Sequence, residues 1–294
     1  MTHWKQGLLI AGLIIAQNSM ACTSDGKEGF LPTNNFKISV NQKRAGGLTE
    51  AQFNAVIDEV EGLYAPIVAQ EAGAPVLKVV RNWTDATVNA YAQQIGKEWR
   101  VSMFGGLARH ETITADGFRL VVCHEIGHHI GGAPRKTSAW ASPWASNEGQ
   151  ADYWATLKCL RRVWNDEDNA AVIATMEIPA ELSAKCGSNL SGEETAVCIR
   201  GGMAGLSVAK LFQALYTEVN APKFETPDAK VVVKTDDNHP ATQCRLDTYF
   251  QGALCEKSFN ENVEAKSEVT GTCHGSTGQK IGLRPLCWFK PAVL

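Results

Sequence analysis

The chain has 294 residues, of which 44% are hydrophobic, 20% charged and 8% aromatic. This composition is typical of a globular protein and excludes a mainly disordered, collagen-like or coiled-coil chain. Lys and Arg number 28 against 31 Asp and Glu, which gives a formal net charge of −3. Since there is no long basic run either, the sequence gives no electrostatic reason to expect nucleic-acid binding.

The N-terminus has the three parts of a secretory signal peptide. Lys5 precedes an apolar run over residues 7–16, and small residues follow it before Cys22. The run is roughly ten residues long, whereas a membrane-spanning helix needs about 20. We therefore predict a signal peptide over residues 1–21, with cleavage after Ala21. Residues 22–46 are polar and rich in Gly, Asn, Lys and Ser, and are predicted to be a flexible tether.

The cysteine count is odd. The nine cysteines are Cys22, Cys123, Cys159, Cys186, Cys198, Cys244, Cys255, Cys273 and Cys287. If Cys22 becomes the lipid-bearing first residue of a bacterial lipoprotein, eight remain for four disulfides. Ser19 stands where a lipobox usually has an apolar residue, so the alternative is ordinary cleavage that leaves Cys22 free. Either way we expect an exported protein in an oxidising compartment: periplasmic, anchored by lipid to an envelope membrane, or secreted.

The first part of the predicted body, which we place over residues 47–259, mixes helices and strands. Thr49 and Gln52 form a capping box before a helix with apolar residues at helical spacing, and Pro66 is expected to kink or end that helix. Extended segments are predicted next over residues 76–80, 87–92 and 99–104. A helix is then predicted over residues 116–130, ending at Gly131-Gly132.

The second part is mainly helical. A loop over residues 134–146 leads into a long helix over residues 147–164, and the helices predicted within residues 167–219 are broken near Pro179, Gly187 and Gly201-Gly202. Residues 230–234 are expected to be a short strand or an extended segment. Pro240 is predicted at the first position of a helix that ends at Leu254. Residues 260–294 read as an irregular, disulfide-containing tail packed on the body.

One predicted helix carries the sequence His-Glu-Ile-Gly-His. His124 and His128 are four residues apart, so they lie on one helix face and can bind one zinc ion. Glu125 lies beside the open position of that ion, where it can take a proton from zinc-bound water and deliver it to a leaving amine. The same spacing also arises by chance on surface helices. The apolar turn over residues 118–123 indicates a buried helix, in which unpaired histidines are unfavourable.

A catalytic zinc ion needs a third protein ligand. Glu148 and Asp152 again stand four residues apart on a predicted helix. Glu148 can bind the metal, while Asp152 can accept a hydrogen bond from a ligand histidine and so fix its tautomer. The alternative is a pair of solvated acids at a helix N-terminus, which the helix dipole favours.

Four segments in this order resemble the gluzincin peptidases, and more closely the family of the CAAX prenyl protease and the HtpX-like membrane proteases. They are Val88-Asn-Ala-Tyr-Ala92, His124-Glu-Ile-Gly-His128, Glu148-Gly-Gln-Ala-Asp152 and His239-Pro-Ala-Thr-Gln-Cys-Arg245-Leu. They span roughly residues 80–255. The family's transmembrane helices have no counterpart after the signal peptide, so its membrane-embedded or prenylated substrates do not carry over.

This resemblance implies a zinc endopeptidase with a zincin-like α+β fold: a helical body with a small, mostly antiparallel sheet beside the metal-binding helix. It implies one zinc ion per chain, held by His124, His128 and Glu148, with Glu125 as catalytic base. Asp152 and Arg245 are implied as supporting residues. His239 is implied near the cleft, where it would help to stabilise the oxyanion, although a His before a helix-opening Pro is also a common structural turn residue.

The strand over residues 99–104 has two interpretations. Zinc peptidases of this kind bind substrate as an added antiparallel strand on a sheet edge, and Gly105-Gly106 would let a substrate backbone approach. The alternative is an ordinary hairpin turn. His129 and His110 are expected to point away from the ion. The tryptophans around the third ligand are expected to pack in the core or loop: Trp140, Trp144 and Trp154.

The disulfide connectivity is left open by the sequence. A bond between Cys123 and Cys159 would join the two metal-bearing helices. The remaining pairs that are plausible by proximity are Cys186–Cys198, Cys244–Cys255 and Cys273–Cys287.

The sequence therefore predicts a zinc endopeptidase of the bacterial cell envelope that acts on a peptide or protein substrate. One rival hypothesis is a non-catalytic zinc-binding envelope chaperone or assembly factor on a peptidase fold. Another is a secreted disulfide scaffold that binds a partner without metal. Substrate preference and oligomeric state do not follow from the sequence.

Overall fold

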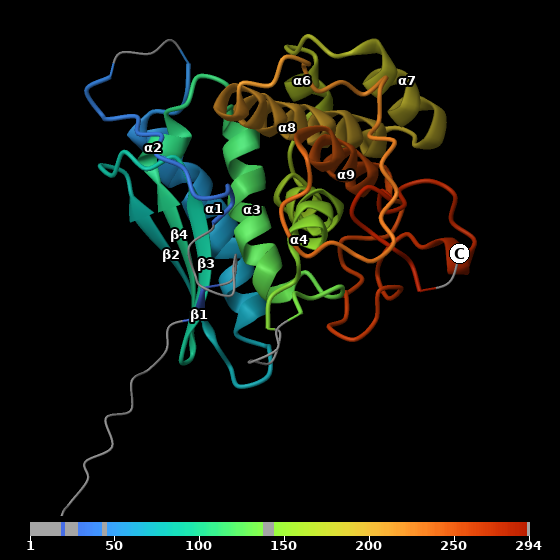
Figure 1. Cartoon of the computed structure of the whole chain (residues 1–294), viewed down its shortest axis with the longest axis horizontal. Helices are drawn as coiled ribbons and strands as arrows, with labels where there is room; N and C mark the ends of the chain where they lie inside the picture. The colour runs from blue at the N-terminus through green and yellow to red at the C-terminus, as the bar shows by residue number, and fades with distance from the viewer. Residues whose placement is uncertain (1–18, 21–28, 43–45, 138–143, 293–294) are drawn as a thin grey trace, which may run out of the picture.

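The computed structural model describes residues 19–20, 29–42, 46–137 and 144–292. Figure 1 shows a mixed α/β body with a small sheet on one side and most helices on the other. The predicted signal peptide, apart from its residues 19–20, and the predicted lipid site at Cys22 lie outside the described residues.

The first helix forms as its sequence predicts. Helix α1 (Glu50–Val68) begins at a complete capping box, in which the Thr49 backbone N–H donates to Gln52 Oε1 at 2.9 Å. Its apolar face is buried, as the helical spacing predicts, in a core formed with the sheet and α3. Pro66 lies in the last turn of the helix, which ends two residues later at Val68.

The sheet is mixed rather than mostly antiparallel. Its strand order is β1-β3-β4-β2, with β1 (Ser19–Met20), β2 (Val76–Asn82), β3 (Ala90–Ile95) and β4 (Glu98–Phe104). β3 pairs antiparallel with β4 and with β1, whereas β2 pairs in parallel with β4 along its whole length. The segment predicted over residues 87–92 becomes a strand only from Ala90.

The prediction that residues 99–104 form an exposed edge is wrong. β4 lies between β2 and β3, so both of its sides are already hydrogen-bonded. Gly105 and Gly106 begin the short helix α2 (Gly105–Ala108) and form neither a hairpin turn nor a free approach for substrate. A Cβ at Gly105 would lie 1.9 Å from the Trp83 carbonyl oxygen, and one at Gly106 would lie 2.0 Å from that of Ala86. These glycines allow α2 to pack against the preceding turn.

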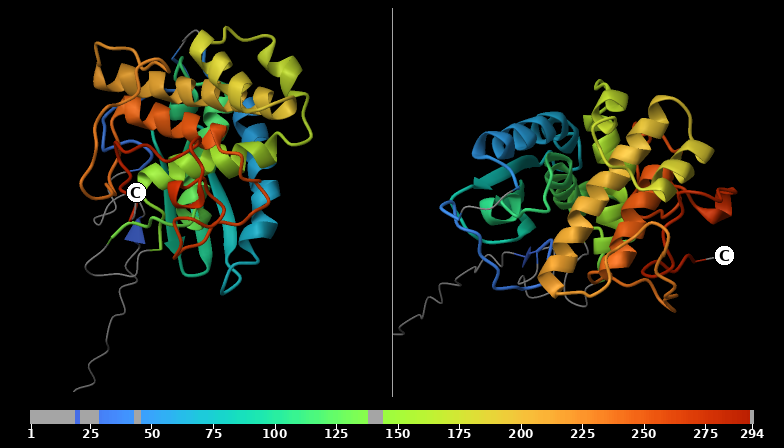
Figure 2. Two further views of the ribbon diagram at one scale, coloured as in Figure 1. Left: turned by 90° about the vertical axis from the view of Figure 1, so that its right-hand side faces the viewer. Right: turned by 90° about the horizontal axis from the view of Figure 1, so that it is seen from above.

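Helix α3 (Ala115–Ile130) crosses the middle of the molecule. It packs against α1, β3 and β4 on one side and against α4 and α8 on the other, and the views of Figures 1 and 2 agree. Because it is covered on all sides, nearly all its residues are buried, including its three histidines. This confirms the expectation of a buried helix.

The predicted helix over residues 147–164 is also present. It consists of α4 (Glu148–Trp154), a π-helical segment (Ala155–Cys159) and α5 (Leu160–Val163). Two short helices follow, α6 (Asn169–Ile173) and α7 (Ala180–Asn189).

Helix α8 (Glu193–Tyr216) contradicts the predicted break at Gly201-Gly202. A Cβ at Gly201 would lie 3.1 Å from the Ala253 Cβ, and one at Gly202 would lie 2.5 Å from Leu182 Cδ1. These glycines therefore permit close helix packing and do not end the helix. Among the described residues α8 alone is long and apolar enough to cross a membrane, but 78% of its apolar window is buried inside the body, as in a core helix.

Helix α9 (Thr242–Leu254) packs on α8. It begins after Ala241, so Pro240 precedes the helix instead of occupying its first position. Residues 230–234 form no β-strand: residues 230–232 are irregular and residues 233–234 form a bend. The Val232 N–H donates to the Leu286 carbonyl of the tail at 2.9 Å.

The tail after residue 260 contains little regular structure, and disulfides hold it to the body. The structure has Cys123–Cys159 and Cys186–Cys198, as predicted. It has Cys244–Cys287 and Cys255–Cys273 in place of the other two predicted pairs. Cys244 and Cys255 lie at opposite ends of α9, about 16 Å apart at the helical rise, too far for a direct bond. Each end of α9 is therefore linked to the tail.

Part of the predicted tether belongs to the body. Phe30, Leu31 and Ile38 are buried in the main core. The Phe30 N–H donates to the Ala90 carbonyl at 2.9 Å, and the Leu31 N–H donates to Asn89 Oδ1 at 3.0 Å. Residues 29–42 are thus anchored beside the start of β3 and are not a flexible linker.

Candidate metal centre

Three side chains with metal-binding atoms meet in the interior. His124 and His128 come from consecutive turns of α3, and Glu148 is the first residue of α4. His124 Nε2 lies 3.2 Å from Glu148 Oε2, and His128 Nε2 lies 3.6 Å from Glu148 Oε1. One ligand atom from each residue lies within 4.8 Å of the others, which is close enough to share one metal ion. All three residues are fully buried.

The loop between the two helices places Glu148. The Ser146 N–H donates to the His128 carbonyl at 2.9 Å, and the Asn147 N–H donates to the Pro134 carbonyl at 3.0 Å, so the chain returns directly onto the end of α3. Asn147 then caps α4, because its Oδ1 accepts from the Gln150 N–H at 2.9 Å. Glu148 therefore starts α4 next to the histidines.

Hydrogen bonds orient both imidazole rings. His124 Nδ1 donates to Asp152 Oδ1 at 2.7 Å, and His128 Nδ1 donates to the Ser146 carbonyl at 2.9 Å. Since a proton on Nδ1 leaves the Nε2 lone pair for a ligand, both rings face Glu148 with the nitrogen that a metal uses. His124 Nε2 has no hydrogen-bond partner among the described residues.

Asp152 is itself fixed by Arg245. The Arg245 guanidinium donates from Nε to Asp152 Oδ2 and from Nη2 to Asp152 Oδ1, both at 2.7 Å. Its Nη1 donates to the Phe30 carbonyl at 2.9 Å. Burial by itself would raise the pKa of Asp152, but the charges of Arg245 and His124 outweigh it and hold this pKa below its usual value. Asp152 therefore stays ionised and keeps His124 oriented.

Glu125 directly follows the first histidine, His124, on α3. Its side chain is fully buried, and neither carboxylate oxygen has a hydrogen-bond partner among the described residues. Burial, together with the nearby charge of Glu148, raises the pKa of Glu125 to about 8 despite the opposing charge of His124. A buried carboxyl group without a partner is costly in a purely structural role.

His239 lies at the same centre. Its Nε2 is 3.4 Å from Glu148 Oε2 and 2.8 Å from the carbonyl oxygen of Gly29, to which it donates. Its side chain is 9% exposed, slightly more than those of the three candidate ligands. His239 thus lies in the irregular segment that precedes α9, and its ring also lies beside the candidate ligand Glu148.

The three candidate ligands differ in their electrostatics. Burial lowers the pKa of His128 to about 3. Burial also opposes the charged form of His124, but Asp152 and Glu148 outweigh it and raise the pKa of His124 to about 9. The pKa of Glu148 lies well below its usual value, because its electrostatic interactions with His239, Lys136 and the ligand histidines outweigh the effect of burial. The site holds ionised Glu148 and a neutral His128 ready to bind a cation.

Lys136 is a residue at the centre that the sequence analysis missed. Its Nζ lies 2.8 Å from Glu148 Oε1. In the sequence it is one lysine in a loop, and neither periodicity nor motif spacing distinguishes it from a solvent-exposed lysine.

His129, His110 and Trp154 contact other protein groups. His129 is stacked between Trp99 and Trp144, with ring centroids 5.1 and 5.0 Å away. Trp154 is buried in the core, and His110 hydrogen-bonds to Thr112. Trp140 lies outside the described residues.

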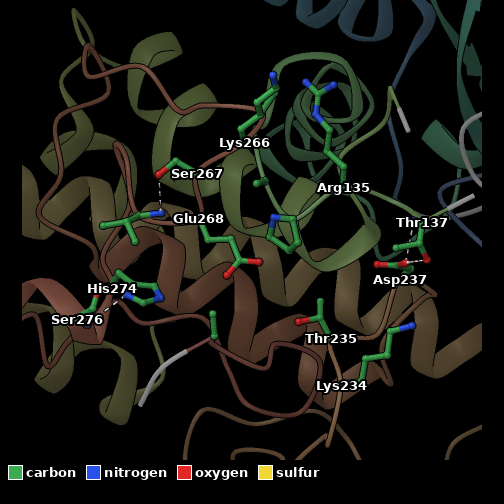
Figure 3. A pocket seen from close by; sticks show the side chains of 15 residues that line it. Arg135, Thr137, Lys234, Thr235, Asp237, Lys266, Ser267, Glu268, His274 and Ser276 are labelled. Atoms are coloured by element: carbon green, nitrogen blue, oxygen red, sulfur yellow. Dashed lines mark hydrogen bonds between the residues drawn. The ribbon is translucent and has the colours of Figure 1, made fainter. Parts of the chain in front are cut away.

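A second side-chain cluster and a cavity lie outside the candidate metal centre. Asp228, Cys244 and Cys287 also lie close together, but these cysteines form a disulfide and have no thiolate to offer. A cavity of about 690 Å³ lies between residues 133–137, residues 234–237 and the tail. Figure 3 shows Thr137 and Asp237 hydrogen-bonded at its edge, at 2.6 Å between Oγ1 and Oδ2. It lies beside the loop that carries Lys136.

The donor set fits a transition-metal ion. Two imidazole nitrogens and one carboxylate are ligands typical of zinc, whereas Ca²⁺ and Mg²⁺ prefer oxygen alone. Comparison with known proteins gives no further guide: no family model, no curated protein and no solved structure matches the chain.

Proposed function

We propose that the chain is a zinc-dependent endopeptidase with a zincin-like fold, in which His124, His128 and Glu148 hold one zinc ion. One observation carries the proposal: three buried ligand atoms converge within 4.8 Å, beside a buried Glu125 whose two oxygens have no partner among the described residues. A structural metal site needs its ligands, but it does not need an additional unpartnered carboxyl group.

The roles of the protein groups follow from this arrangement. A bound zinc ion polarises a peptide carbonyl and lowers the pKa of a water molecule. Glu125 accepts the proton of the attacking water and transfers it to the nitrogen of the leaving amine, so no covalent enzyme intermediate is needed. Asp152 and Arg245 keep His124 in the tautomer that leaves Nε2 free. His239 is our proposed donor to the developing oxyanion, a role in which its Nε2–H would exchange the Gly29 carbonyl for the substrate oxygen.

The β3 edge of the sheet is the proposed place for substrate. β3 packs against α3. β1, the two residues Ser19–Met20, pairs with its outer edge over Gln93 and Gln94, and the Phe30 N–H donates to the Ala90 carbonyl at its start. The predicted signal cleavage after Ala21 would remove β1 and leave backbone donors and acceptors of β3 for an extended peptide. This replaces β4, which the sequence suggested for that role.

The compartment is consistent with this function. Four disulfides indicate an oxidising, extracellular-type environment. We propose that the mature protein works in the bacterial cell envelope or outside the cell, with Cys22 as a candidate lipid anchor and a peptide or protein as substrate.

The proposal is tested by metal content and by one matched variant. Elemental analysis of the mature protein should find one zinc ion per chain, lost in His124→Ala. Glu125→Gln should retain the zinc ion and lower the hydrolysis of a quenched-fluorescent peptide library about a hundredfold or more, because it keeps the side-chain shape and removes the base. A protein without zinc, or a Glu125→Gln variant of full activity, would refute the proposal.

Full burial of the ligands supports a second candidate, a non-catalytic metal-binding protein of the cell envelope. All three ligand side chains have no exposed surface, as in a closed structural site. This candidate predicts one zinc ion per chain, no hydrolysis by the wild type at any zinc concentration, and unfolding after zinc removal. The unpartnered Glu125 makes it the weaker of the two.

A further inference from the structure

The ammonium group of Lys136 forms an ion pair with the candidate metal-binding carboxylate of Glu148. Lys136 Nζ is 2.8 Å from Glu148 Oε1, and its side chain is only 16% exposed. The backbone of Lys136 is held in place, because its N–H donates to the Ala145 carbonyl at 2.9 Å. The neighbouring Arg135 forms an isolated antiparallel β-bridge with Ser146. The lysine is thus built into the loop that connects the ligand helices.

The two oxygens of Glu148 face different partners. Oε2 lies near His124 and His239, at 3.2 and 3.4 Å. Oε1 lies near His128 and Lys136, at 3.6 and 2.8 Å. An ion bound by both ligand histidines would therefore share this carboxylate with the ammonium group, only a few ångströms away. Two cations at that separation repel each other strongly in a buried site.

Asp152, another buried acid of the site, has Arg245 as its counter-ion. Asp152 is paired with Arg245 through two hydrogen bonds of 2.7 Å, which leave it saturated whether or not a metal is present. Glu148 has no arginine among the described residues within hydrogen-bond distance. A lysine ammonium is a point charge on a long flexible side chain, so its position can adjust at lower cost than that of a bidentate arginine.

We propose that Lys136 is a positioning residue that neutralises Glu148 in the metal-free protein and competes with zinc for this carboxylate. It keeps the ligands assembled in the absence of metal and makes zinc binding weaker and exchangeable. This inference rests on the metal site of the proposed function, but it does not require that the site be catalytic.

The test compares zinc affinity in three proteins: wild type, Lys136→Gln and Lys136→Arg. Gln keeps a hydrogen-bond donor and removes the charge, whereas Arg keeps the charge. Competition with a chromophoric chelator should give a zinc Kd at least about tenfold lower for Lys136→Gln, because the repulsion is removed. Lys136→Arg should stay within roughly threefold of wild type. Without metal, Lys136→Gln should melt at a lower temperature than wild type, and zinc should raise its Tm by more.

The results separate this inference from the proposed function. A Lys136→Gln variant that binds zinc as wild type does, or more weakly, overturns the inference and leaves the metal site standing. Zinc binding by Lys136→Gln but not by wild type supports the inference and refutes a zinc enzyme in its native form. Absence of zinc from both proteins refutes both.

A second measurement uses the wild-type chain, in case Lys136→Gln does not fold. Reductive methylation followed by mass spectrometry reports the accessibility of each lysine amine. Zinc should raise the labelling of Lys136 several-fold, because the ion replaces the ammonium group at Glu148, while the exposed Lys78 serves as an unaffected reference. Unchanged labelling of Lys136 in the zinc-loaded protein would overturn the inference.

Discussion

Two buried arginine–carboxylate pairs in this molecule are alike in construction. Arg245 of α9 binds Asp152 of α4 at the metal centre, and Arg200 of α8 binds Asp116 of α3 elsewhere. Each makes two hydrogen bonds to its carboxylate, and each guanidinium stacks on an aromatic ring, 4.5 Å from Phe30 or 4.3 Å from Trp164. The pairs differ in burial and partners, because the Asp116 side chain is 11% exposed and also pairs with Arg119, whereas that of Asp152 is fully buried.

They differ in where their hydrogen bonds lead. Arg200 continues to Glu167 at 2.7 Å and to Asn169 at 2.8 Å, which ends the network in further protein groups. Arg245 continues through Asp152 to His124, whose Nε2 has no hydrogen-bond partner among the described residues. The first network is closed and structural. The second ends at Nε2 of a candidate metal ligand, and this end, not the ion pair, distinguishes the two networks.

The largest expected effect comes from removing each arginine. Arg245→Met should lower the free energy of unfolding by about 3–5 kcal/mol, because it removes the arginine partner of the fully buried Asp152 carboxylate. Arg200→Met should lower it less, because Asp116 keeps its ion pair with Arg119. Only Arg245→Met should also weaken zinc binding. Urea denaturation of the metal-free proteins, followed by zinc titration of the folded variants, checks both parts. Equal zinc affinities for the two variants would show that the networks do not differ in function.

A milder change isolates the effect on the ligand. Asp152→Asn should weaken zinc binding roughly 10–100-fold, because the amide no longer provides the charged acceptor that holds His124. Asp116→Asn makes the matched change in the closed network and should leave zinc affinity unaltered. Isothermal titration with zinc measures both. A loss of affinity in Asp116→Asn as large as in Asp152→Asn would mean that a general loosening of the fold, not His124, is responsible.

Much of the fold was predictable because local rules agree with the tertiary structure. The capping box at Thr49 and the buried turn before His124 both follow from spacing and composition. The predictions that were wrong concern segments whose structure is determined by contacts with residues distant in the sequence. Gly201 does not break α8 because Ala253 packs against it, and β4 is central because β2 pairs with it in parallel.

The candidate site was predictable to the extent that its residues repeat at helical spacing. His124 and His128 lie one turn apart on α3, and Glu148 and Asp152 lie one turn apart along α4, so each pair shares a face. Lys136 has no such partner in the sequence, since its position depends on the path of the loop. The pairing of Cys244 with Cys287 could have been anticipated in part, because a predicted helix ending at Leu254 already separates Cys244 from Cys255.

The smallest expected effect is a difference in the pH dependence of zinc binding between wild type and Asp152→Asn. The pKa of His124 is raised to about 9 by Asp152 and Glu148, which outweigh its burial. Because the folded-state pKa lies above the usual value of about 6.5, the protonated ring stabilises the metal-free protein fully below that pH. This stabilisation is lost as the pH rises through 9.

Zinc binding has the opposite dependence, because the ion must displace this proton. The zinc affinity should fall about tenfold for each unit of pH below 9, or about 1.4 kcal/mol per unit. Titrations between pH 6 and 9 in wild type and Asp152→Asn provide the measurement. The slope should be shallower in Asp152→Asn, since the pKa of His124 falls when its charged partner is removed. An equal slope in both proteins would mean that Asp152 does not control the proton on His124, and the contrast with the closed network at Asp116 would then lose its chemical basis.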